Sequence, residues 1–369
     1  MILSNPNAFF VFVGTYTQTD AALPERPEGL FVFRLNPFNG SLEPVQVVSG
    51  ISNPTYLSLT PNNRYLYAVS ELSESKSYAG GGISAFSVDP ASGLLKLINS
   101  QPTLGALPCY VSIDPINRYV WVANYAGGST VILPILKDGS LAAPAAVIQH
   151  VGHGPNPQRQ EKPHIHSVTL DPKNEFALVA DLGLDKIFVY RANDIYQKAA
   201  GDPVFEAFSE PGAGPRHLTF HPNHRFVYAV HELSATVSCY TFDHETGALH
   251  KIQNLPTLPE DFHGMNLCAD VHVTPNGEFL YVSNRGHDCI ASFAIDPLTG
   301  RLTLLGYTPT QGKTPRNFAI TPTGRLLLAA NQQSDSIVAF QIDASTGGLK
   351  PTGEVTRVPS PVCIKVIAV

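Results

Sequence analysis

Four short motifs carry side chains that could act together on a small anionic substrate. They are His166 in HIH (164–166), Arg216 in GPRH (214–217), Glu232 in VHE (230–232) and Arg285 in SNR (283–285). Guanidinium groups bind carboxylates and phosphates through paired hydrogen bonds and need no metal to do so. A histidine titrates near neutral pH, and a positioned glutamate is a competent general base. These residue types predict an anion pocket with an acid–base pair, provided that the fold brings them together.

An internal repeat of about fifty residues indicates the fold that must position them. Six stretches each consist of an alternating apolar run, a Pro-centred turn and a second apolar run, as in LTFHPNHRFVYAVHE (218–232). A Pro followed by Asn or Gly between two β-rich runs is typical of a hairpin turn. The six turn prolines are Pro61, Pro115, Pro172, Pro222, Pro275 and Pro322. Each stretch therefore predicts a two-stranded hairpin.

A second pattern, a third strand followed by a turn and a short fourth strand, occurs seven times, for example in IASFAIDPLTGRL (290–302). The chain ends supply the missing seventh hairpin, with an innermost strand over 361–366 and its neighbour over 9–15. A blade built from both ends closes a ring and removes exposed edge strands. We therefore expect an all-β fold: a seven-bladed β-propeller of four-stranded antiparallel blades, forming a single domain over 1–369 and closed by the N- and C-terminal strands in one blade.

The hairpin register predicts which side chains meet at the central channel. Each proline turn lies at one end of its hairpin, so the start of the first strand and the end of the second share the opposite end. The residues six positions before the turn prolines are Thr55, Cys109, His166, Arg216, Ala269 and Arg316. The residues ten positions after them are Glu71, Tyr125, Leu182, Glu232, Arg285 and Gln332. Because innermost propeller strands surround the channel, we expect these positions to form one rim.

This rim supplies two groups of candidate site residues. The candidate catalytic residues are His166, Arg216, Glu232 and Arg285. The candidate substrate-binding residues, on the rim or close to it, are Glu71, His164, His217, Asp270, Asn284, Arg316 and Asn331. An alternative interpretation is that these side chains only satisfy one another as ion pairs in a water-filled channel. The polar segment 152–162, directly before HIH, could border the pocket as a lid or be an ordinary surface insertion.

With these motifs and their order in view, the sequence resembles the lactonase family of seven-bladed propellers. The resemblance covers essentially the whole chain, from VGTYT (13–17) to the closing strand. That family includes the propeller-type 6-phosphogluconolactonases and the fungal carboxy-cis,cis-muconate cyclase. In the cyclase branch the proposed site joins one histidine, two arginines and one glutamate, and by motif these would be His166, Arg216, Glu232 and Arg285.

Three functions fit this pattern. The first is a metal-independent, 6-phosphogluconolactonase-like ester hydrolase that opens a small anionic or sugar lactone. Arg216 and Arg285 would then hold the anionic group or the developing oxyanion. Glu232 and His166 would serve as base and acid, in either order. The second is a cycloisomerase that closes a carboxylated muconate to a lactone, and the third is a non-catalytic propeller that binds a protein partner.

The composition of the chain limits the kinds of partner that we expect it to bind. The net charge is −6, and no basic stripe could neutralise the phosphates of a nucleic acid. No apolar run reaches the roughly 18–20 residues of a membrane helix, so we expect no membrane partner. The five scattered cysteines indicate buried thiols in a reducing compartment, which predicts a cytoplasmic protein. His164 and His166 could chelate a metal, but the spacing specifies no third ligand, so we expect neither metal nor cofactor.

Overall fold

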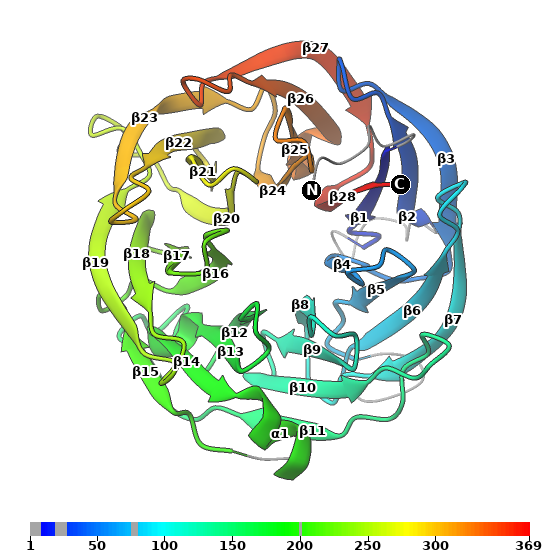
Figure 1. Cartoon of the computed structure of the whole chain (residues 1–369), viewed down its shortest axis with the longest axis vertical. Helices are drawn as coiled ribbons and strands as arrows, with labels where there is room; N and C mark the ends of the chain where they lie inside the picture. The colour runs from blue at the N-terminus through cyan, green and yellow to red at the C-terminus, as the bar shows by residue number, and fades with distance from the viewer. Residues whose placement is uncertain (1–8, 19–27, 75–79, 199–200) are drawn as a thin grey trace.

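The computed structural model describes residues 9–18, 28–74, 80–198 and 201–369. Seven four-stranded antiparallel sheets surround one axis, which confirms the predicted seven-bladed β-propeller (Figure 1). Within the described ranges, helical structure is limited to short segments in the connections. These are η1 (Leu182–Leu184), η2 (Gln332–Ser334) and α1 (Ala192–Lys198).

The strands occupy four successive positions from the channel outward. The innermost strands are β4 (Leu57–Leu59), β8 (Pro108–Ile113), β12 (Ile165–Leu170), β16 (Pro215–Phe220), β20 (Leu267–Val273), β24 (Pro315–Ile320) and β28 (Pro361–Ala368). The second strands are β5 (Tyr65–Ser70), β9 (Tyr119–Asn124), β13 (Phe176–Asp181), β17 (Phe226–His231), β21 (Phe279–Arg285), β25 (Leu326–Asn331) and β1 (Phe9–Thr15). The third strands are β6 (Gly82–Val88), β10 (Ser129–Pro134), β14 (Lys186–Arg191), β18 (Thr236–Phe242), β22 (Cys289–Ile295), β26 (Ser336–Ile342) and β2 (Glu28–Leu35). The outermost strands are β7 (Leu95–Pro102), β11 (Ala146–Gln149), β15 (Phe205–Phe208), β19 (Leu249–Pro256), β23 (Leu302–Pro309), β27 (Leu349–Arg357) and β3 (Leu42–Ser49).

The two chain ends complete one blade, as the repeat predicts. Its strand order is β28-β1-β2-β3, with β1 antiparallel to both of its neighbours. Val11 pairs with Val366 on one side and with Phe33 on the other. In Figure 1 the red β28 accordingly lies beside the blue β1 at the channel. Because β1 is bonded along both edges, the ring is closed by main-chain hydrogen bonds between the first and last strands.

The turns of the inner hairpins share one backbone conformation. The residue two positions after each turn proline adopts a positive φ, the left-handed region that Asn and Gly tolerate best. The φ angles are 57° at Asn63, 59° at Asn117, 60° at Asn174, 64° at His224, 80° at Gly277 and 71° at Gly324. This common turn gives the six hairpins the same register, so equivalent residues reach the same height along the channel.

The hydrophobic core lies between neighbouring blades. One cluster, for example, joins Phe176 and Leu178 of β13 to Val227 and Ala229 of β17 in the next blade. The turns between third and fourth strands add to this packing: Gly300 has a φ of 71°, and a Cβ there would lie 2.5 Å from the ring of Phe226. Close contact of this kind requires glycine and locks this blade against its neighbour.

Candidate active site

The innermost strands begin around one mouth of the channel, at the end opposite the proline turns, and enclose a small cavity there. Its empty volume, including open solvent, is about 260 Å³, of which only about 10 Å³ can hold the centre of a water molecule. The second residue of each of five innermost strands lines it, namely Cys109, His166, Arg216, Arg316 and Val362. Thr55, Tyr56, Glu71, His217 and Asn317 complete the lining. The shared register therefore brings residues from all around the ring to one opening.

Glu232, which like Arg285 does not itself line the cavity, contacts the lining residue Arg216 and connects the four candidate catalytic side chains. It follows β17 directly, its backbone N–H donates to the Gly214 carbonyl at 2.7 Å, and it is 3% exposed. Its Oε2 accepts hydrogen bonds from Arg216 Nε at 2.9 Å and from Arg285 Nη2 at 2.8 Å. His166 Nε2 lies 3.9 Å from the same oxygen.

The arginines keep this buried carboxylate ionised. Burial alone would raise the pKa of Glu232, but the charges of Arg285 and Arg216 outweigh burial and hold that pKa well below its usual value. Burial lowers the pKa of Arg285 to about 10, which still leaves its guanidinium charged at neutral pH. Glu232 and its arginines thus combine a permanent negative charge with fixed positive charge in a site that excludes most water.

His166 is a neutral imidazole in this environment. Burial, followed by the nearby charge of Arg216, holds the pKa of His166 well below its usual value. Its Nδ1 lies 3.7 Å from the sulfur of Cys109, whose own thiol pKa is raised by burial. The ring stands edge-on to Tyr125, with centroids 5.4 Å apart. A neutral imidazole beside a carboxylate can hold and pass a proton during a reaction but does not start out as an acid.

Arg159 is a site residue that the register does not predict. It lies in the loop before β12, and its Nη2 donates to Glu232 Oε1 at 2.5 Å and to the Tyr125 hydroxyl at 3.3 Å. The segment 152–162 therefore borders the site, as one of the two interpretations of the sequence suggested. Strand register cannot locate a loop side chain, and the sequence of the segment contains no other signal for Arg159.

A second carboxyl group, that of Glu71, lies elsewhere on the cavity wall. Its Oε1 accepts from the Tyr16 hydroxyl at 2.7 Å and its Oε2 from the Thr55 hydroxyl at 2.5 Å. Arg316 Nη2 donates to the Tyr16 hydroxyl at 3.3 Å. Tyr16 follows β1 in the same way that Glu71 follows β5. Register could have identified it, but the closing blade has no turn proline from which to count.

His217 and Asp270 lie one layer deeper in the channel and orient Arg216. Arg216 Nη1 donates to His217 Nε2 at 3.1 Å, and His217 Nδ1 donates to Asp270 Oδ1 at 2.8 Å. His272 Nε2 lies 2.9 Å from the other Asp270 oxygen. Burial lowers the pKa of His217 to about 3, so its ring is neutral and its tautomer is fixed by these two bonds.

The structure does not bring Asn284, Asn331 or His164 to the cavity, in contrast to our prediction. The Nδ2 atoms of Asn284 and Asn331 donate to the carbonyls of Thr257 and Thr310, at 2.8 and 3.1 Å. Successive strand residues point to opposite faces, so Asn284, one position before Arg285, points away from the site.

His164 instead supports the wall behind His166. Its ring stacks on Tyr125 at 4.5 Å between centroids, and its Nε2 lies 3.1 Å from Glu161. Although both rings contact Tyr125, the ring nitrogens of His164 and His166 face different groups instead of converging as an HxH metal pair. Among the described residues, no group of three His, Cys, Asp or Glu side chains is arranged to hold a metal ion.

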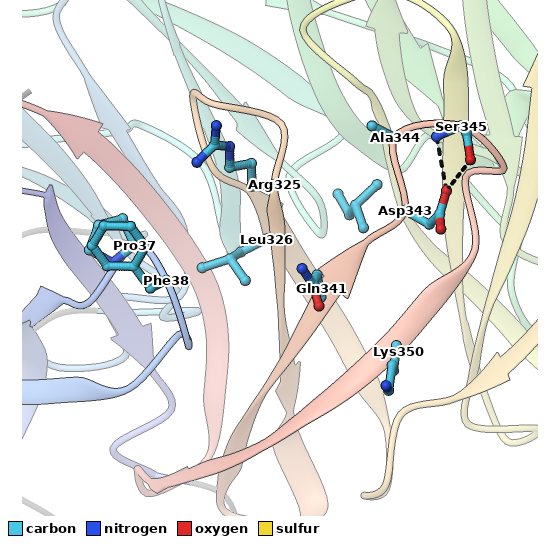
Figure 2. Close-up of a pocket in the computed structure, with 10 residues that line it drawn as sticks. Pro37, Phe38, Arg325, Leu326, Gln341, Asp343, Ala344, Ser345 and Lys350 are labelled. Atoms are coloured by element: carbon cyan, nitrogen blue, oxygen red, sulfur yellow. Dashed lines mark hydrogen bonds between the residues drawn. The ribbon is translucent and has the colours of Figure 1, made fainter. Parts of the chain in front are cut away.

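A larger hollow, of about 1300 Å³ including open solvent, lies at the proline-turn end of the molecule (Figure 2). It is bounded by the turns that follow β2 and β26 and by the β24–β25 hairpin turn, with Phe38 exposed at its edge. Figure 2 shows its charged side chains, Arg325, Asp343 and Lys350, spread apart along the walls. Asp343 bonds the backbone and hydroxyl of Ser345 in its own turn. This hollow brings no acid–base pair together.

Comparison with known proteins agrees with the fold and with the resemblance. The family model described as "Lactonase, 7-bladed beta-propeller" matches residues 10–366, and the chain belongs to that family. It is 36% identical over 307 residues to the 6-phosphogluconolactonase of Bacillus subtilis, covering 83% of each chain. It is 35% identical to the 6-phosphogluconolactonase of Formosa agariphila, over 84% of this chain and 86% of that one. The periplasmic gluconolactonase PpgL of Pseudomonas aeruginosa superposes with a TM-score of 0.90 at 35% identity, covering 98% and 99% of the two chains.

The five cysteines are free and buried, as the sequence predicts. Burial raises the pKa of Cys268, close to the site, to about 12, which makes its thiol a poor nucleophile. The described helices include none long and apolar enough to cross a membrane. The cytoplasmic location stays a prediction, because PpgL is a periplasmic protein.

Proposed function

We propose that this protein is a metal-independent lactonase that hydrolyses a sugar lactone at the cavity edged by Glu232. The observation that carries the proposal is the contact of one ionised, buried carboxylate with Arg216 and Arg285, beside a neutral His166. The names of its relatives, 6-phosphogluconolactonase and gluconolactonase, support a lactone as the substrate.

In the proposed reaction Glu232 accepts a proton from water while the water oxygen bonds to the lactone carbonyl carbon. The carbonyl oxygen becomes an oxyanion beside Arg216 and Arg285, whose fixed charge stabilises it without reorganisation. When the ring C–O bond breaks, the leaving alkoxide takes up the proton that Glu232 held. His166, initially neutral, relays that proton or donates a hydrogen bond to the alkoxide. The product is the open hydroxy acid, which loses its carboxyl proton to solvent.

The two alternative functions have weaker support. The named relatives are lactonases, which favours neither a cycloisomerase nor a protein-binding propeller. Ultraviolet absorbance provides a direct check on the first alternative, because a cyclase would consume the conjugated diene of a carboxylated muconate. We expect no loss of diene absorbance with this protein.

Replacing the carboxylate tests the proposal. We expect Glu232→Gln to lower kcat for opening of δ-gluconolactone or its 6-phosphate by about two orders of magnitude or more, the usual contribution of a general base. Acid release measured in a pH-stat, after subtraction of uncatalysed hydrolysis, reports the rate. Glu278→Gln, an exposed glutamate at the proline-turn end, is the matched control. A folded Glu232→Gln protein with full activity would remove Glu232 from the mechanism.

A further inference from the structure

Arg159 differs from the other two arginines that contact Glu232. The side chains of Arg216 and Arg285 come from strands and are 2% and 10% exposed, whereas that of Arg159 comes from a loop and is 34% exposed. Its hydrogen bonds to Glu232 and Tyr125 both use Nη2. Within the described part of the chain, Nη1 and Nε thus remain open to a ligand that enters the mouth.

The anchoring of the loop allows the side chain to turn without moving the backbone. The neighbouring Gln160 is fully buried, and its Nε2 donates to the Leu182 carbonyl at 2.9 Å and to Asp185 at 2.7 Å. Its Oε1 accepts from the Asn156 backbone at 3.0 Å. The main chain is therefore fixed beside Arg159, and a change of rotamer is enough to carry its guanidinium from Glu232 toward a substrate.

The charges around the mouth favour an anionic substrate. Four guanidinium groups, from Arg159, Arg216, Arg285 and Arg316, accompany the carboxyl groups of Glu71 and Glu232, and Asp270 adds a third carboxyl group one layer deeper. A neutral lactone would leave the excess positive charge uncompensated. A phosphate monoester carries a charge of about −1.5 to −2 at pH 7 and presents oxygens that match a guanidinium edge.

The contact of Arg159 with Glu232 also bears on the reaction itself. Oε2 of Glu232 is occupied by Arg216 and Arg285, and Oε1 is occupied by Arg159. A carboxylate with both oxygens engaged is poorly placed to accept a proton from water. Departure of Arg159 would free Oε1 and remove one of the charges that lower the pKa of Glu232.

We propose that Arg159 is a specificity-determining residue that exchanges Glu232 for the phosphate of a phosphorylated sugar lactone. This proposal rests on the proposed lactonase function. Binding of the phosphate draws Arg159 away and exposes Oε1 of Glu232, so that the base becomes available when the preferred substrate is in place.

The test compares δ-gluconolactone with its 6-phosphate. Arg159→Ala should lower kcat/KM for the phosphorylated lactone by about 10- to 100-fold, mainly through KM, since charge-assisted hydrogen bonds are lost. We expect the value for the unphosphorylated lactone to change less than threefold or to rise, because Oε1 is freed. Lys162→Ala, an exposed loop residue bonded to the Ala126 carbonyl, is the matched control and should leave both values unchanged. Equal losses with both lactones would overturn the proposal.

Product binding separates this proposal from the proposed function. Calorimetry should show that the wild-type protein binds 6-phosphogluconate more tightly than gluconate, and that Arg159→Ala abolishes the difference while Lys162→Ala retains it. A wild-type protein that opens neither lactone contradicts the lactonase function. A wild-type protein that opens gluconolactone yet shows no preference for the phosphorylated lactone or acid overturns the role of Arg159 alone.

Discussion

At the scale of the residue, the chemistry depends on one buried carboxylate and the guanidinium groups around it. Glu232 is stable as an anion inside the protein because Arg216 and Arg285 approach its Oε2 within 3 Å. An isolated buried charge would be costly, so each partner contributes to stability as well as to chemistry. The site therefore couples activity to folding, and the two effects need separate measurement.

Removal of Arg216 should affect both the activity and the stability of the protein. We expect Arg216→Ala to lower the free energy of unfolding by about 3–5 kcal/mol, because it leaves Glu232 partly uncompensated in a buried position. Urea denaturation followed by circular dichroism measures this change. Arg118→Ala breaks the ion pair of a half-exposed arginine with Asp114, which keeps hydrogen bonds from Tyr119 and Asn174, and should cost less than about 1 kcal/mol. Equal stabilities of the two variants would contradict the account of Glu232.

A buried histidine outside the site makes stability depend on pH. Burial lowers the pKa of His231 in β17 to about 4, whereas the unfolded chain takes up this proton near pH 6.5. Between these values the unfolded state binds more protons, so stability falls as the pH decreases from 6.5 to 4. The difference corresponds to roughly 3 kcal/mol. We expect His231→Gln to lose that part of the pH dependence, measured by denaturation at pH 7 and pH 4.5. An unchanged pH dependence would exclude the assignment.

Strand register predicts the position of a side chain that belongs to a regular hairpin. It fails for a side chain in a loop or next to a chain end. Counting from the turn prolines places His166, Arg216 and Glu232 on the rim, where the structure finds them together. The same count cannot reach Tyr16, whose blade lacks a turn proline, or Arg159, which lies in a loop. One-residue steps also reverse side-chain direction, which is why Asn284 points away from the cavity.

At the scale of the element, the outer hairpins, formed by the third and fourth strands, keep their register because the turns between these strands pack against the neighbouring blade. Gly300, in the turn after β22, contacts Phe226 of β17, and its carbonyl accepts the Tyr228 hydroxyl at 2.9 Å. The same arrangement recurs between Tyr281 and Gly347. Alternating apolar runs predict these strands, but the contacts between turn and blade arise only when the ring is assembled.

Gly300→Ala tests this turn contact. The new Cβ would meet the Phe226 ring at 2.5 Å and would require an alanine at a φ of 71°, so we expect a loss of about 2–4 kcal/mol in unfolding free energy. Gly353 has a φ of 92° but no atom within 4 Å of the position of a new Cβ. Gly353→Ala should therefore carry backbone strain alone, about 1–2 kcal/mol. Similar losses in the two variants would show that the contact with Phe226 contributes little.

At the scale of the whole molecule, closure of the ring brings equivalent positions of the sequence repeats together at one site. Seven innermost strands that are far apart along the chain begin around one mouth, and the last of them, β28, closes the ring against β1. The sequence predicts both the seven blades and their closure, because the turn prolines mark the period and the chain ends complete the count. It does not predict the paths of the loops across the mouth, since these carry no repeat.

Loss of the closing strand should affect the entire ring. Deletion of residues 361–369 would leave β1 without its inner partner and expose its inner edge. We expect this truncated chain to be aggregated or to unfold at a much lower temperature than the full chain. Deletion of Val369 alone, which lies beyond β28 and is only partly buried against the core, is the control and should lower the unfolding temperature far less. A truncated chain with the stability of the full protein would show that closure is dispensable.

The central claim is that a sugar lactone is opened at the cavity edged by Glu232. A crystal structure of the wild-type protein with its sugar-acid product tests this claim most directly. We expect the product carboxylate to lie against Arg216 and Arg285, beside His166. Product bound in the hollow at the proline-turn end, with the arginines still closed around Glu232, would contradict it.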